Sequence, residues 1–185
     1  MNETPIKDDL SLKHVFSQIA MSESTSIYIR EIAKLLVNNT ISKSKIQEIL
    51  LQYSISSIRT IKNELLDMLI AYSNLILEDG IITDTERRNF EFLKLYFEIK
   101  ENDFYIEKQP EIKAILDKEF EKLYADNFIT QSEAETNVIL QDMFDLNYNQ
   151  FDKLKEDFVK KSIRQGADIT DLDTANINAL KEKDS

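Results

Sequence analysis

The stretch that decides the fold is DGIITDTE at residues 79–86, which separates two long segments with helical apolar stripes. It recurs 47 residues later as DNFITQSE at residues 126–133. Gly80 and Asn127 are of the two residue types that most readily adopt the left-handed conformation just past a helix end. Each copy therefore predicts a place where one helix stops and another begins. We call residues 79–86 the first corner and residues 126–133 the second corner.

Each corner also contains a signal for the start of the following helix. Thr83 and Thr130 are good N-cap residues, and Glu86 and Glu133 follow them by three positions. In such a capping box the hydroxyl accepts from the backbone of the glutamate, and the carboxylate accepts from the backbone of the cap. We therefore expect a capped helix to begin directly after Thr83 and after Thr130.

The corners belong to a longer internal repeat, because residues 64–105 align without a gap with residues 111–152. Ten of these 42 positions are identical, against roughly three expected by chance. The identical pairs are Glu64/Glu111, Leu69/Leu116, Asp79/Asp126, Ile82/Ile129, Thr83/Thr130, Glu86/Glu133, Leu93/Leu140, Phe97/Phe144, Asn102/Asn149 and Phe104/Phe151. The repeat predicts two copies of one helix-corner-helix unit.

The alternative to the helix-cap interpretation is that the corner residues bind a divalent cation. Gly80, Ile82 and Glu86 have the spacing of the sixth, eighth and twelfth positions of a calcium-binding EF-hand loop. Leu75 and Leu77, however, would occupy the first and third positions, where calcium needs oxygen ligands. We therefore prefer the helix-cap interpretation and keep a cation site as the second one. Its candidate ligands are Asp79, Glu86, Asp126 and Glu133.

Composition indicates an all-α fold. The chain of 185 residues is 42% hydrophobic and contains two Gly and two Pro, too few for the turns of a β-sandwich or barrel. We expect a compact helical bundle of about seven to eight helices built around the duplicated unit. A mobile leader over residues 1–9, a single domain over 10–166 and a flexible or marginally helical tail over 167–185 complete the predicted organisation.

Two helices carry more specific expectations. Apolar residues at helical spacing predict one helix of about 25 residues from Ser54 to the first corner, and its late turns are apolar nearly all round. A helix of that kind is central in a bundle. Asn149 is the expected N-cap of the last helix, which Gly166 would end.

Arg87 and Arg88 are candidate partner contacts. They lie in the first turns of the helix after the first corner, where the helix dipole disfavours cations. A surface ion pair with a neighbouring acid is the alternative explanation.

The residue inventory argues against an enzyme. The chain has no Cys, and His14 is its one histidine, which excludes the common zinc sites and Cys-His nucleophile pairs. Glycines at positions 80 and 166 alone cannot form a phosphate-binding loop. We therefore predict no catalytic residues and no bound cofactor apart from the alternative cation.

Charge and hydropathy limit the partners and the location. A net charge of −11 disfavours nucleic acid, which selects clustered Lys and Arg, and favours a protein partner or a cation. There is no apolar run of membrane-spanning length and no signal-peptide pattern over residues 1–10. We expect a cytoplasmic protein without membrane insertion.

A long apolar helix, the motif Asp-Gly-x-Ile-Thr-x-x-Glu at the first corner, and the Leu-x-x-x-Phe of Leu93 and Phe97 resemble the TerB-like tellurite-resistance group. The resemblance covers mainly residues 55–158, and Asn127 departs from its glycine. It implies a non-catalytic helical module that binds another protein in a bacterial stress or defence context, with the acidic corner residues as candidate cation contacts. A small acidic inhibitor or immunity-type protein that binds a basic toxin or nuclease is the alternative.

Overall fold

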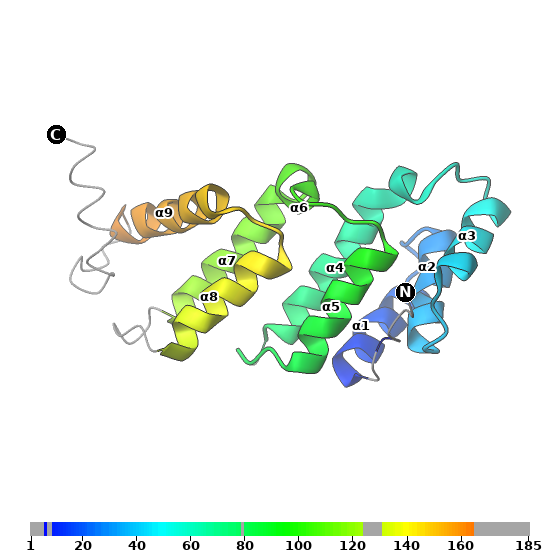
Figure 1. The fold of residues 1–185 in the computed structure, drawn as a ribbon, viewed down its shortest axis with the longest axis horizontal. Helices are drawn as coiled ribbons and strands as arrows, with labels where there is room; N and C mark the ends of the chain where they lie inside the picture. Colours follow the sequence, from blue (N-terminus) through cyan, green and yellow to red (C-terminus); the bar gives the residue numbers. More distant parts are fainter. Residues whose placement is uncertain (1–5, 7–8, 79, 124–130, 165–185) are drawn as a thin grey trace. The chain divides into compact units, whose positions relative to one another are not determined.

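The structure is a computed structural model that describes Ile6 and residues 9–78, 80–123 and 131–164, without the side chains of 123, 131–135, 161 and 162. All regular structure in these residues is helical, which confirms the predicted all-α class. The elements are α1 (Leu10–Met21), α2 (Ile27–Val37), α3 (Lys43–Gln52), the 3-10 turn η1 (Ile58–Ile61), α4 (Lys62–Ile76), α5 (Asp84–Tyr96), α6 (Asp103–Glu107), α7 (Gln109–Leu123), α8 (Gln131–Met143) and α9 (Tyr148–Arg164) (Figure 1). The described residues thus contain nine α-helices, one of which is the short α6.

Contacts between residues divide the chain into two compact units, Met1–Asp103 and Phe104–Ser185. The prediction of one domain over 10–166 stays a prediction. The predicted tail, residues 167–185, lies outside the described residues. In the predicted leader, Ile6 is 4% exposed and Asp9 caps α1 by accepting from the backbone of Ser11.

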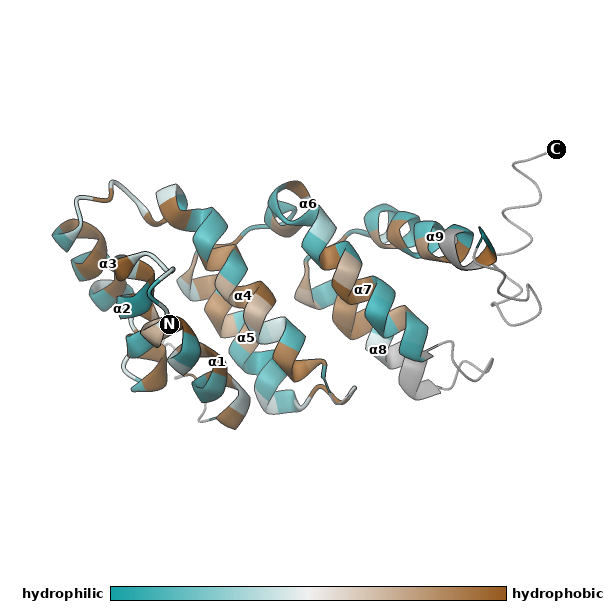
Figure 2. Cartoon of the chain, turned by 180° about the vertical axis from the view of Figure 1, so that it is seen from behind, coloured by the Kyte–Doolittle hydropathy of each residue, from teal (hydrophilic) through white to brown (hydrophobic). Residues whose placement is uncertain are grey.

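The core of the first unit is organised around α4, which packs against α1 and α5. Tyr72 of α4 lies between Phe16 of α1 and Phe90 of α5, with ring centroids 5.8 and 6.2 Å away. All three side chains are fully buried. Each such aromatic pair contributes about 0.5–1.5 kcal/mol beyond the area it buries. Figure 2 shows the brown apolar faces of these helices beside teal polar ones.

The predicted 25-residue helix is wrong in its first part. Ser54 has a φ of 55°, η1 follows, and α4 begins at Lys62 with 15 residues. The apolar spacing of Ile55, Ile58 and Ile61 continues across this break, which is why the sequence pattern joined the segments. The longest described helix is α9, with 17 residues.

Four helices end in the same backbone turn, with a left-handed residue that is not glycine. These residues are Asn39, Ser54, Glu98 and Asp145, with φ between 50° and 55°. After each of them the next backbone N–H returns to a carbonyl five residues earlier, as in Ile99 to Lys94 and Leu146 to Gln141. This is the Schellman motif, which satisfies carbonyls at a helix end.

The second unit has its own aromatic core. Phe120 of α7 contacts Phe151 and Phe158 of α9, with ring centroids 5.8 and 5.5 Å apart. Phe104 of α6 meets Phe144 edge-on at 5.5 Å. The Phe120 contacts tie α7 to α9, and the Phe104–Phe144 contact joins α6 to the end of α8, in both cases through large buried rings.

The N-cap predicted for the last helix is wrong by two positions. Asn147 Oδ1 accepts from the backbone of Gln150 at 3.0 Å, and Gln150 Oε1 accepts from the backbone of Asn147 at 2.9 Å. Asn149 is instead exposed within the first turn of α9. Asn147 and Asn149 lie on either side of Tyr148. Asn147 is the N-cap because Gln150, three residues later, returns its hydrogen bond.

Candidate functional site

The first corner ends α4 differently from the prediction. Gly80 has the predicted left-handed conformation, with a φ of 77°. However, α4 ends at Ile76, and Leu77 is its C-cap. Gly80 therefore redirects the chain after the helix has already ended. Asn127, its counterpart, lies outside the described residues.

The start of α5 has the predicted capping box. Thr83 Oγ1 accepts from the backbone of Glu86 at 3.2 Å, and Glu86 Oε2 accepts from the backbone of Thr83 at 2.9 Å. Glu86 is only 8% exposed, and its other oxygen, Oε1, accepts from Ser11 Oγ at 2.9 Å. Both oxygens of this carboxylate thus accept hydrogen bonds from the protein, and the bond from the Thr83 backbone is that of a helix cap.

The structure does not describe the side chains of the other predicted cation ligands. Asp79 and Asp126 are outside the described residues, as is the side chain of Glu133. Among the side chains that the structure describes, no group of three or more His, Cys, Asp and Glu residues could hold a metal ion. The cation site at the corners stays a prediction.

A second carboxylate joins Glu86 in a partly buried polar network. Tyr72 donates to Asp9 Oδ2 at 2.6 Å, while Asp9 Oδ1 accepts from the backbone of Ser11 at 3.0 Å. Burial, the Asp9 hydrogen bond and the charge of Glu86 raise the pKa of Tyr72 well above its ordinary value, although Asn89 lowers it. The network connects α1, α4 and α5 through side chains that hydrogen-bond to one another.

The two predicted arginine contacts are both on the surface of α5. Arg87 lies 3.9 Å from Asp84, and both side chains are at least half exposed. An exposed pair of this kind contributes about 0–1 kcal/mol. Arg88 is also exposed. The surface ion pair therefore accounts for Arg87, while the position of Arg88 leaves it accessible to a partner.

An exposed surface on α1 is a candidate site that sequence reasoning missed. Leu10 and Met21 are 86% and 80% exposed. They are eleven residues apart, which puts them about 16 Å apart and within about 20° of one another around the helix. With His14, Ser17 and Gln18 they form what we call the α1 outer face, beside an open depression of about 930 Å³ that Leu75 and Glu78 also border. The α1 outer face was not predicted because it mixes apolar and polar residues, whereas the sequence pattern was read for stripes of apolar residues only.

A smaller cleft of about 260 Å³ lies between α1, α2 and α4, and we call it the α1–α2–α4 cleft. Its polar lining consists of Glu64, Asp67 and the hydroxyl residues Ser24, Thr25 and Ser26. Its apolar lining consists of Ile19, Ile29, Met68 and Ala71. Among the described residues that line this cleft, the charged ones are Glu64 and Asp67.

Glu64 is held in this cleft by two hydroxyl groups. Ser26 Oγ donates to Oε1, and Tyr28 donates to Oε2 at 2.8 Å. The Ser26 hydrogen bond lowers the pKa of Tyr28, but burial and the charge of Glu64 outweigh it and raise that pKa overall. These partners are 38 and 36 residues away in sequence, so no local signal marked Glu64.

No helix in the described parts of the chain is both long enough and apolar enough to cross a membrane. Comparisons with protein-family models, curated proteins and solved structures find no match for this sequence. The TerB-like resemblance therefore stays a prediction.

Proposed function

We propose that the protein is a non-catalytic helical module that acts by binding another protein through the α1 outer face. The observation that carries this proposal is the exposure of Leu10 and Met21 on one side of one helix. Burying two such side chains contributes about 3–6 kcal/mol. That gain offsets part of the cost of association, and polar contacts around the two side chains would have to supply the rest.

The polar groups of the first unit support a binding role over a catalytic one. Glu86 and Asp9 both accept hydrogen bonds from protein donors, and His14 lies on the surface with Gln18 Nε2 3.1 Å from its Nε2. A catalytic site brings a nucleophile or general base to a pocket that excludes water. The depression over α1 is open, so it favours contact with a second surface.

The proposal is tested with the full chain in its source cells. A tagged wild type and the variant Leu10→Glu/Met21→Glu are purified under the same conditions, and bound proteins are quantified by mass spectrometry. We expect one partner to be retained by the wild type and reduced at least about tenfold in the variant, because a buried carboxylate opposes contact.

The matched control is Leu51→Glu/Leu95→Glu, since these two side chains are 69% and 65% exposed in the same unit. It adds the same charge away from α1 and should retain the partner. Equal retention by all three proteins, or no partner of the wild type, would contradict the proposal.

The cellular context is proposed from the sequence alone. The TerB-like motif favours a bacterial stress or defence setting, with a cation at the corners as an optional feature. A small acidic inhibitor is the second candidate, supported by the net charge of −11. For that role, Arg87→Glu/Arg88→Glu should leave affinity for a basic partner intact, whereas reversing several exposed acids should abolish it.

A further inference from the structure

We draw no further inference here: the strongest candidate, the open depression of about 930 Å³ beside Leu10 and Met21 on α1, belongs to the surface already assigned to the proposed function, and nothing in the described parts of the chain shows what covers it.

Discussion

The carboxylate of Glu86 accepts a hydrogen bond from the hydroxyl of Ser11 at 2.9 Å, which joins the start of α5 to the first turn of α1 across 75 residues of sequence. The same carboxylate completes the capping box with Thr83. One side chain thus fixes a helix start and a contact between two helices.

Replacing Glu86 should therefore cost more stability than replacing either partner. We expect Glu86→Ala to lower the free energy of unfolding by about 2–3 kcal/mol and Ser11→Ala by about 1 kcal/mol. Urea unfolding followed by circular dichroism measures both values. Arg88→Ala, on the exposed side of the same helix, should stay within about 0.5 kcal/mol of the wild type. Equal effects of Glu86→Ala and Arg88→Ala would refute the role of the network.

Glycine should stabilise the left-handed helix ends. Glu98 has a φ of 54°, a conformation that costs a residue with a Cβ about 1–2 kcal/mol. Glu98→Gly removes that strain, although glycine adds about 0.5–1 kcal/mol of unfolded-state entropy. We expect a net gain of about 0.5–1 kcal/mol in the free energy of unfolding.

Its control is Glu101→Gly, three positions along the chain, where no positive φ is relieved. That change should destabilise by about 0.5–1 kcal/mol. We therefore expect Glu98→Gly to raise the free energy of unfolding and Glu101→Gly to lower it. Changes of the same sign in both variants would rule out strain at Glu98. Asp145→Gly, at the equivalent position of the second copy, should behave like Glu98→Gly.

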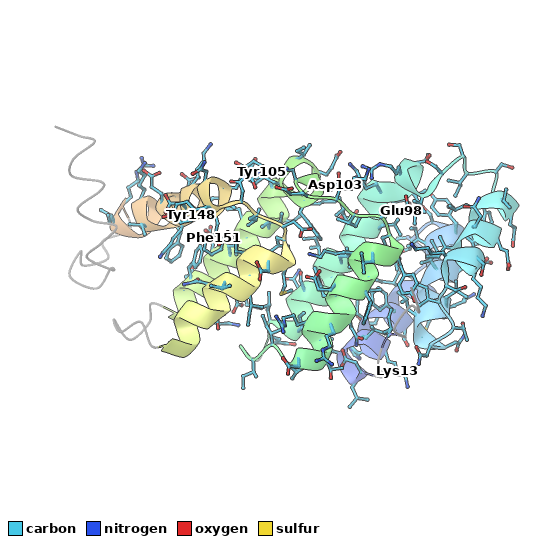
Figure 3. All side chains as sticks on the ribbon, in the orientation of Figure 1. Lys13, Glu98, Asp103, Tyr105, Tyr148 and Phe151 are labelled. Carbon is cyan, nitrogen blue, oxygen red and sulfur yellow. The ribbon has the colours of Figure 1, made fainter. Side chains whose placement is uncertain are left out.

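Asp103 should make stability depend on acidic pH. Its Oδ1 accepts from Lys62 Nζ at 2.8 Å and lies 3.6 Å from Arg59, which also donates to the carbonyl of Glu98. Figure 3 labels Asp103 and Glu98. Burial raises the pKa of Asp103, but the hydrogen bonds from Lys62 and the backbone of Lys100, together with the two positive charges, lower it overall.

A carboxyl whose pKa is lower in the folded state stabilises the fold above its unfolded pKa, about 3.9, and loses that contribution as pH falls through its folded pKa. We expect Asp103→Asn to cost about 2 kcal/mol at pH 7. The difference from wild type should be constant from about pH 5 to 8 and shrink below about pH 4. Urea unfolding at a series of pH values measures it, and a difference that persists unchanged to the lowest pH would be inconsistent with this assignment.

Divalent cations provide the test of the corners. Because both oxygens of Glu86 accept protein hydrogen bonds, we expect no ion-selective change in Tm when calcium, magnesium, manganese or zinc replaces EDTA. A cation at a hundred times its Kd would stabilise by about 2.7 kcal/mol, a rise of several degrees. A selective rise that is lost in Asp79→Asn/Asp126→Asn would establish the alternative cation site.

The features that sequence reasoning identified correctly are local ones. Thr83 and Glu86 are three residues apart, so the pattern itself contains the whole capping box. The non-helical segment after Ser54 was missed because the apolar spacing of Ile55, Ile58 and Ile61 continues through it into α4. The contacts of Glu64 with Ser26 and Tyr28 come from packing of α2 against the start of α4, which no spacing within one helix reports.

The turns after α5 and α8 use main-chain hydrogen bonds, from Ile99 to Lys94 and from Leu146 to Gln141. A bond between backbone groups is indifferent to most side-chain replacements. Substitutions on the surfaces of the two copies can therefore leave the ends of α5 and α8 at the same residues.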